Sequence, residues 1–318
     1  MMTTPKHSLR QRWLTGSRCL AALLLLSGCV EEHLLDRPAN ANNVLLMYEW
    51  EAGMTLPENH LLLRFYPLDG GEPLSFRTYY WGFEGAVPPG EYRVLAFTDG
   101  VKGLSFADTD DYARAKAIAL PDEENMEYYD DPELLQQAGQ LFVVSDSRLV
   151  VAPQGRTERH YPVRLLNSRI YVTVHNQTER AAVEVTCRLR GLSFARQLAN
   201  GDADFNAGIG EHVFTMPFYP YDDASTLVSC LGFFNPEPDK DGVFRYQSLL
   251  DITVTYEGRA EEELVHDITE EVADELGKTD IARSIQLDIN LLHDDEGKLA
   301  VSVTINPWDG NINMNVDA

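Results

Sequence analysis

The chain has 318 residues, of which 44% are hydrophobic, and it carries 50 Asp or Glu against 26 Lys or Arg. The hydrophobic share excludes a generally disordered chain, and the net charge of −24 argues against a nucleic-acid partner, because phosphate binding requires clustered Lys and Arg. The length predicts two domains of about 130–150 residues each.

Residues 1–28 are predicted to be a secretory signal peptide. They carry four Lys or Arg and no Asp or Glu, and the apolar run at 20–26 is too short to span a hydrocarbon core of ~30 Å. Leu26-Ser27-Gly28-Cys29 resembles the bacterial lipobox. That resemblance implies cleavage between Gly28 and Cys29 and a lipidated Cys29 as the first mature residue. The alternative is an ordinary signal peptide followed by a chance cysteine.

Loss of the signal peptide removes four positive charges and takes the net charge from −24 to −28. Acyl chains on Cys29 would supply the membrane affinity, since each buried methylene contributes ~0.8 kcal/mol, and the acidic body should stand off anionic headgroups. Residues 29–43 are predicted to be the tether. Glu31 and Glu32 resemble the acidic export signal of Bacteroidetes surface lipoproteins, or they simply charge the tether. We therefore expect a lipid-anchored outer-membrane protein at the cell surface.

From Val44 onward, short apolar or alternating runs recur between turn residues, and Val, Ile, Thr, Tyr and Phe dominate them. At 170–175, apolar side chains alternate with Tyr, Thr and His, which is the period of two expected of a strand. The predicted strands are Val44–Trp50, His60–Tyr66, Glu91–Phe97, Leu141–Ser145, Tyr161–Leu166, Ile170–His175, Val183–Leu189, His212–Tyr219, Thr226–Phe234, Leu249–Tyr256, Ser284–Leu292, Leu299–Ile305 and Ile312–Val316.

Helical patterns are scarce. The best is Thr269–Leu276, where Asp267 and Glu270 have capping-box spacing and Gly277 stands at the C-cap; a second, at Glu124–Gln137, is interrupted by a proline. Strands without intervening helices indicate antiparallel sheets, hence an all-β fold of sandwiches with little helix. The predicted division is an N-terminal sandwich at 44–166 and a C-terminal sandwich at 167–318.

Two mature cysteines, Cys187 and Cys230, lie in strand-like runs, and a disulfide or two unexposed thiols are both open. The segment Gly191–Ala195 has the form of a nucleophile elbow around Ser193, but the sequence after it is polar and no βαβ unit is visible, so a strand ending in a turn is favoured. No catalytic residue is assigned.

The eight His residues are scattered, so no zinc site is predicted, and no cofactor is assigned. Acidic turns at 202–206 and 237–242 have the alternating oxygens of a calcium loop, but both lack the twelfth-position Glu of an EF-hand. Exposed aromatics at Tyr79-Tyr80-Trp81 and at 218–221 are candidates for stacking on sugar rings, with core or edge packing as the alternative.

Several segments resemble the fimbrillin and fimbrial-anchor lipoproteins of Bacteroidetes. Val87–Phe97 resembles their "PPGxYxxLxF" strand, in which Tyr92, Val94 and Ala96 share one face. His266-Asp267-Ile268-Thr269 is similar to their late "DIT" motif, and Asn306-Pro307-Trp308-Asp309 with the closing strand Ile312–Val316 is similar to their terminal hairpin. The resemblance covers most of residues 44–318.

This resemblance implies two transthyretin-like sandwiches and a role in surface fimbriae or adhesion. Shaft subunits of the family are cut after an early Arg, whereas here Arg37 precedes a proline and Arg64 lies in a predicted strand. An anchor or accessory subunit is therefore favoured. We expect a non-enzymatic lipoprotein that holds fimbrial subunits or other surface proteins by β-strand addition. The alternative is a polysaccharide-binding surface lipoprotein.

Overall fold

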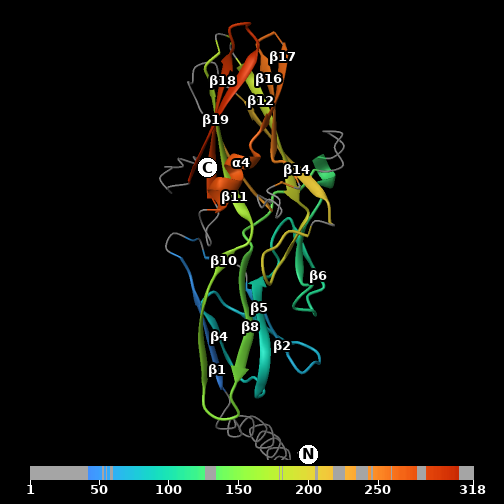
Figure 1. Ribbon diagram of the computed structural model, residues 1–318, viewed down its shortest axis with the longest axis vertical. Helices are drawn as coiled ribbons and strands as arrows, with labels where there is room; N and C mark the ends of the chain where they lie inside the picture. Colours follow the sequence, from blue (N-terminus) through green and yellow to red (C-terminus); the bar gives the residue numbers. More distant parts are fainter. Residues whose placement is uncertain are drawn as a thin grey trace, which may run out of the picture.

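The computed structural model describes residues 42–307, except 52–53, 55, 58–59, 126–133, 179, 181, 205–206, 218–225, 234–242, 245, 259 and 278–283. The molecule is elongated, with two groups of sheets stacked along its long axis, and the chain enters the first strand at the lower end (Figure 1). Gly28, Cys29 and the closing strand Ile312–Val316 lie outside the described residues. None of the helices in the described part is long and apolar enough to cross a membrane.

The lower group consists of two sheets that enclose a core of their own. One sheet has the order β4-β1-β9 and the other β10-β8-β5-β2-β3. In β1, buried and half-buried residues alternate, so that Val44, Leu46 and Tyr48 face the core between the sheets. The strands are β1 (Val44–Glu49), β2 (Leu61–Pro67), β3 (Leu74–Thr78), β4 (Gly82–Gly85), β5 (Gly90–Thr98), β8 (Phe142–Val151), β9 (Thr157–Pro162) and β10 (Arg164–Leu165).

β5, which follows the Pro-Pro-Gly turn, is buried on both faces from Val94 to Thr98. Tyr92, Val94 and Ala96 belong to the lower core, which confirms that they share a face, while Leu95 and Phe97 belong to a second, larger core. The Tyr92 hydroxyl donates to the carbonyl oxygen of Pro88 at 2.9 Å, and so fixes the turn that leads into the strand.

The upper group is a sandwich of two four-stranded sheets, ordered β15-β11-β18-β19 and β14-β12-β16-β17. In β16, every second residue is buried, as the alternation in the sequence predicts. The strands are β11 (Ser168–Asn176), β12 (Ala182–Ser193), β14 (Ile209–Pro217), β15 (Thr226–Gly232), β16 (Leu249–Tyr256), β17 (Glu261–Asp267), β18 (Ser284–His293) and β19 (Leu299–Pro307).

The prediction of purely antiparallel sheets is wrong at two places. β1 pairs in parallel with β9, and β11 pairs in parallel with β18. Parallel neighbours need a long connection, and here each connection runs through other strands of the same half rather than through a single helix. The sheets are therefore mixed.

A third, small sheet joins the two groups. It has the order β13-β7-β6 and combines β6 (Leu104–Ala107) and β7 (Lys116–Ala119) with β13 (Ala195–Gln197). The larger core runs across the junction, because Phe97 and Val143 pack in the same cluster as Val172 and Leu189. The division into domains at 44–166 and 167–318 stays a prediction, since this core crosses it.

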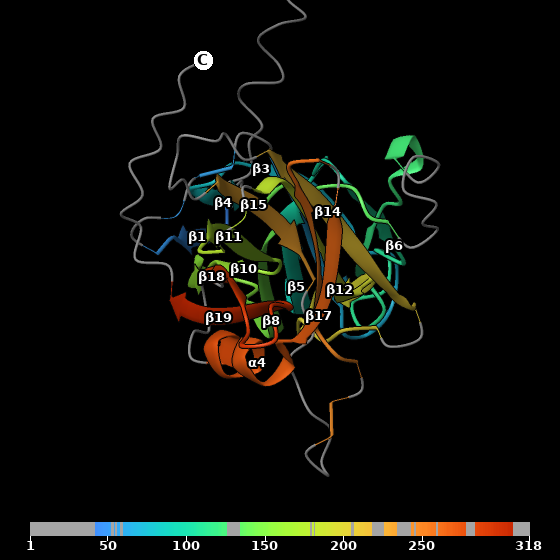
Figure 2. The same cartoon turned by 90° about the horizontal axis from the view of Figure 1, so that it is seen from above.

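The predicted helix is present as α4 (Thr269–Gly277). Asp267 Oδ1 accepts hydrogen bonds from the Thr269 amide at 3.0 Å and the Thr269 hydroxyl at 2.5 Å, which caps the first turn. Ile268 and Val272 are fully buried in the larger core. Figure 2 shows α4 on the side of β19 that faces away from β18. Most of the second predicted helix, Glu124–Gln137, lies outside the described residues, and its described end is not helical, because Leu134 and Leu135 form β-bridges with Glu211 and Pro121.

Candidate functional site

A protein that binds a partner by strand addition needs a sheet edge whose backbone groups are unpaired. The outermost strands of the five sheets are β4 and β9, β10 and β3, β15 and β19, β14 and β17, and β13 and β6. Their length, charge and cover decide which of them can accept another strand.

The edges of the lower group are short or charged. β3 has five residues and exposes Arg77, and β4 has four residues and exposes Glu84. β9 exposes Glu158, Arg159 and His160 and ends at a proline. β10 has two residues, and the edges of the small joining sheet, β6 and β13, have four and three. Short strands, charges and proline are the features by which natural sheets prevent edge pairing.

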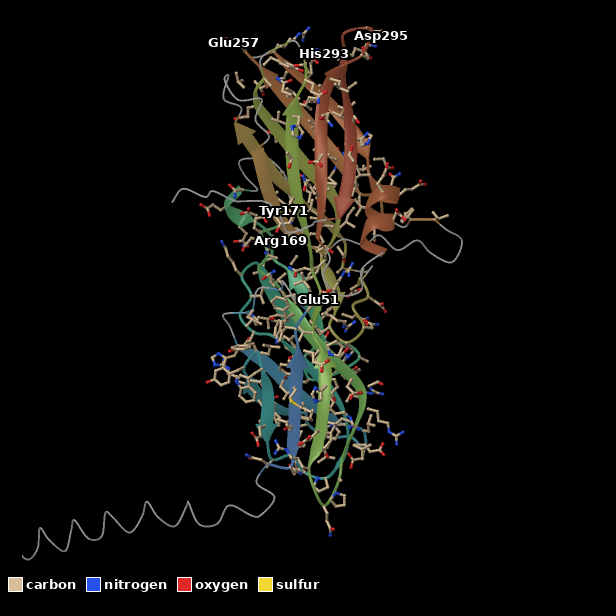
Figure 3. All side chains as sticks on the ribbon, turned by 90° about the vertical axis from the view of Figure 1, so that its left-hand side faces the viewer. Glu51, Arg169, Tyr171, Glu257, His293 and Asp295 are labelled. Carbon is tan, nitrogen blue, oxygen red and sulfur yellow. The ribbon has the colours of Figure 1, made fainter. Side chains whose placement is uncertain are left out.

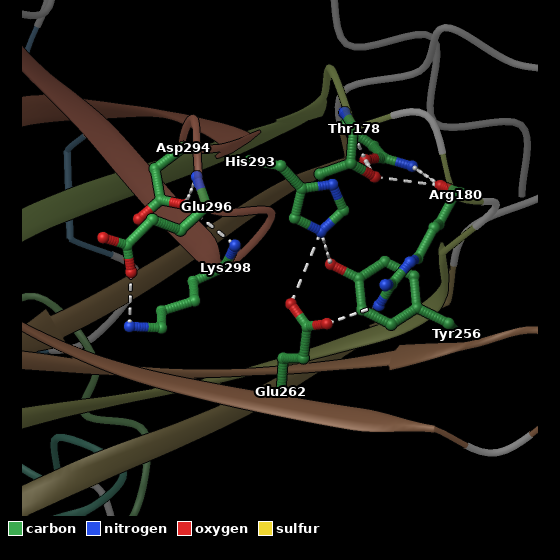
Figure 4. A network of polar contacts seen from close by, with 9 residues as sticks. Thr178, Arg180, Tyr256, Glu262, His293, Asp294, Glu296 and Lys298 are labelled. Atoms are coloured by element: carbon green, nitrogen blue, oxygen red, sulfur yellow. Dashed lines mark hydrogen bonds and ion pairs between the residues drawn. The ribbon is translucent and has the colours of Figure 1, made fainter.

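The upper edge strand β17 is strongly acidic. Its exposed face carries Glu261, Glu263, Val265 and Asp267. On its inner face, Glu262 Oε1 accepts a 2.5 Å bond from Arg180, and its Oε2 lies 3.4 Å from His293 Nε2 (Figure 4). His293 lies at the upper tip with Glu257 and Asp295 (Figure 3). The exposed face of β17 is therefore negatively charged, and Arg180 and His293 hold the Glu262 side chain on its inner face.

Two further edges of the upper group are in contact with other segments of the chain. β19 lies against α4. β14 is met by a segment from the first half of the chain, because the Leu135 amide donates to the Glu211 carbonyl at 2.9 Å and the buried His212 Nδ1 lies 3.0 Å from the Leu135 carbonyl.

β15 is uncharged, as β19 also is, but β19 packs against α4, and β15 lies at the opposite edge of the same sheet. Its seven residues, TLVSCLG, carry no charge. It pairs antiparallel with β11 through Ser168–Val174, and no described strand pairs with its other edge. Among the described strands, β15 is therefore the candidate docking edge.

The aromatic turn between β3 and β4 is exposed. Stacking on sugar rings requires this exposure, whereas packing into the core would bury the rings. Tyr79, Tyr80 and Trp81 are 55%, 45% and 49% exposed. The rings of Tyr79 and Trp81 are nearly parallel, with centroids 6.2 Å apart, and the His60 ring lies 4.8 Å from that of Tyr79. The other aromatic candidate, residues 218–221, lies outside the described residues.

A polar groove of about 490 Å³ opens beside β2 and β5. Its walls come from three separate segments, so no local pattern in the sequence predicts it. Tyr66 and Tyr112 meet edge to face in it, and Arg93 lies 5.5 Å above the Tyr112 ring. Two of its three carboxylates have cationic partners: Asp110 pairs with Arg64, and Asp111 with Arg114. The Ala113 amide and Arg114 hold the pKa of Asp111 below its usual range.

Ser193 is unsuited to nucleophilic catalysis. It is buried, its hydroxyl donates to the Ala195 carbonyl at 2.8 Å, and the chain continues into β13 rather than into a helix. Ser193 ends the strand β12, as the favoured interpretation predicts, but a bend at Phe194 rather than a turn leads into β13.

Cys187 is a free, fully buried thiol, so it forms no disulfide with Cys230. Burial raises the pKa of Cys187 to about 12, which keeps the thiol protonated and unreactive at neutral pH.

The acidic turn at 202–206 uses its carboxylates internally. Asp202 accepts a hydrogen bond from Asn200, and Asp204 pairs with Lys116 at 2.9 Å. Within the described ranges, no group of three or more His, Cys, Asp or Glu side chains is arranged to hold a metal ion. The turn at 237–242 lies outside those ranges.

Comparisons with solved structures identify the fold. A candidate adhesin from Bacteroides ovatus matches with a TM-score of 0.59 and 15% identity, over 85% of this chain and 95% of that chain. The fimbrial anchor protein Mfa2 from Porphyromonas gingivalis matches at 0.55 and 11%, over 83% and 96%. A candidate adhesin from Bacteroides thetaiotaomicron matches at 0.55 and 10%, over 83% and 95%.

No family model and no curated protein matches the chain. At these identities the solved structures establish the fold alone. The resemblance to fimbrillins and fimbrial anchors is confirmed at that level, and the neighbours are adhesins and fimbrial proteins by description.

Proposed function

We propose that this chain is a lipid-anchored surface protein that serves as a fimbrial anchor or accessory adhesin subunit and catalyses no reaction. The shared fold with a fimbrial anchor supports this proposal. The lipobox at Cys29 supports it independently. The described chain starts at the lower end of the long axis (Figure 1), so an anchor before it would leave the upper sandwich projecting away from the bilayer.

The partner is held by strand addition at β15. The observation that carries this step is the contrast between the uncharged, seven-residue edge of β15 and the other described edges, which are short, charged or in contact with another segment. An added strand would complete main-chain hydrogen bonds along β15, and these give affinity with little dependence on sequence. The acidic face of β17 would reject the same strand.

Photo-cross-linking in the native cells tests this assignment. A benzophenone amino acid replaces Ser229 in β15 or, as the matched control, the exposed Val265 in β17. We expect one distinct surface protein to cross-link at position 229 and not at 265. Equal cross-linking at both positions, or none at 229, would overturn the assignment of β15.

A further inference from the structure

The rings of His60, Tyr79 and Trp81 form a row that no core uses. Neither hydrophobic core of the described residues includes them, whereas Phe76, three residues before Tyr79, packs against the lower core. Two of the three rings are about half exposed despite their size. Large exposed aromatic groups with no structural use mark binding sites more often than ordinary surface does.

Hydrogen bonds to the backbone fix the turn that carries Tyr79 and Trp81. The Gly82 amide donates to the Tyr79 carbonyl at 3.1 Å, and the Trp50 indole donates to the Tyr80 carbonyl at 2.6 Å. The Tyr48 amide donates to the Trp81 carbonyl at 3.3 Å. Because these bonds fix the backbone before any ligand arrives, binding would cost little conformational entropy.

Polar groups flank one end of the row. The Asp99 amide donates to the His60 carbonyl at 2.9 Å, which holds the backbone of Asp99 against that of His60. Arg77 Nη2 lies 3.4 Å from Asp99 Oδ2, and the two side chains are 74% and 36% exposed. Apolar faces with a few hydrogen-bonding groups at the margin are the composition of a small-ligand site.

The row lies too far from the anchored end to be a membrane belt. Trp and Tyr also gather at bilayer interfaces. However, the six residues of β1 rise about 20 Å from Val44 to the upper end of the strand. The Trp81 carbonyl accepts its hydrogen bond from Tyr48, near that upper end. Figure 3 places Glu51, just after β1, at the level where the two groups of sheets meet.

We propose that the row of His60, Tyr79 and Trp81 binds a glycan by stacking on the C–H faces of its sugar rings, with Arg77 and Asp99 as hydrogen-bonding partners for its hydroxyls. Pyranose rings combine an apolar face with a polar perimeter, which matches rings bordered by charged groups. This site is separate from β15, so one molecule can hold a partner strand and a saccharide together.

The test is affinity electrophoresis of the purified full-length lipoprotein in detergent, through gels that contain mannan, xylan, galactan or glycogen. We expect at least one of these neutral polysaccharides to retard the protein, and Trp81→Ala and Tyr79→Ala each to weaken that retardation about tenfold. The matched control is Tyr80→Ala, which removes a similarly exposed ring of the same turn that lies outside the row.

Three outcomes would overturn the proposal: retardation by none of the four polysaccharides, equal losses in Tyr80→Ala and Trp81→Ala, or unchanged retardation in the Tyr79→Ala/Trp81→Ala double variant. Far-ultraviolet circular dichroism of each variant verifies that the fold is intact. Cross-linking at position 229 should be unchanged in all of them, which separates the outcome from that of the β15 experiment.

Discussion

The amide of Ala119 donates a 2.7 Å hydrogen bond to the carbonyl oxygen of Phe194, which joins a strand of the first half of the chain to the segment before β13. A second bond, from the Leu198 amide to the Ala115 carbonyl at 2.9 Å, continues the junction. If the proposed anchor and partner pull on opposite ends of the molecule, these bonds and the core beneath them would carry the load between the two groups of sheets.

This junction predicts that the described sheets unfold together. Phe97 is 1% exposed and contacts Phe106 at 4.8 Å between ring centroids, within the core that crosses the junction. Phe97→Ala should cost about 3–5 kcal/mol. Urea unfolding followed by hydrogen exchange should show loss of protection in β11 as well as in β5; an effect confined to β5 would contradict the junction.

Gly82 should tolerate no side chain. Its φ is +130°, and an added Cβ would lie 2.0 Å from the Leu46 carbonyl oxygen. Gly82→Ala should therefore lower the free energy of unfolding by more than the ~1–2 kcal/mol cost of a left-handed residue alone. The control is Gly155→Ala, where φ is +85° and nothing lies within 4 Å. Calorimetric midpoints that fall equally in both variants would refute this account of the turn.

The contact between Arg180 and Glu262 at the upper tip should make a modest, salt-dependent contribution to the free energy of unfolding. Arg180 and Glu262 are 52% and 23% exposed, and Arg180 also lies 5.6 Å above the Tyr256 ring. A double-mutant cycle with Arg180→Ala and Glu262→Ala should give a coupling of about 0.5–1 kcal/mol that weakens in 1 M salt. The Lys298–Glu296 pair, with both side chains 73% exposed, should give less. The reverse order would show that burial does not set the strength of these pairs.

Cys187 predicts an alkaline loss of stability. Burial raises the pKa of the folded thiol to about 12, above the value of ~8.5 for an unfolded cysteine. Between these values the unfolded chain releases the proton and the folded chain retains it, so stability is complete below pH ~8.5 and falls as pH rises toward 12. In a Cys230→Ser background, iodoacetamide should alkylate Cys187 in urea but not in the folded protein. Fast alkylation of the folded protein would contradict the burial of this thiol.

The sequence predicted the elements whose signals are local. β16 alternates in burial as its sequence predicts, whereas β11, which alternates in sequence, is buried on both faces from Ile170 to Val174. α4 has its cap at Asp267 and its glycine at the end. β17 was not predicted because its run EEELVHD has the charge of a solvated loop, and β7 was not predicted because four residues are too few to establish a period. The parallel pairings depend on contacts across more than 110 residues, as between Val44 and Thr157.

The candidate sites also differ in whether a local sequence pattern could reveal them. The aromatic turn could be singled out from Tyr79, Tyr80 and Trp81, because three adjacent rings are a local signal. That β15 is an edge depends on the order of strands in the sheet, and the groove around Tyr66 and Tyr112 depends on tertiary packing. Neither property has a pattern in the sequence.

The most direct test of the central claim follows the complex that is cross-linked at position 229 in cells with and without Cys29. With Cys29 present, the cross-linked pair should fractionate with the outer membrane, and in a Cys29→Ser strain the same pair should leave the outer-membrane fraction, because the chain then lacks its acyl chains. If the pair stays with the outer membrane in the Cys29→Ser strain, or if no partner is cross-linked in either strain, this protein does not hold its partner to the cell through a lipid on Cys29.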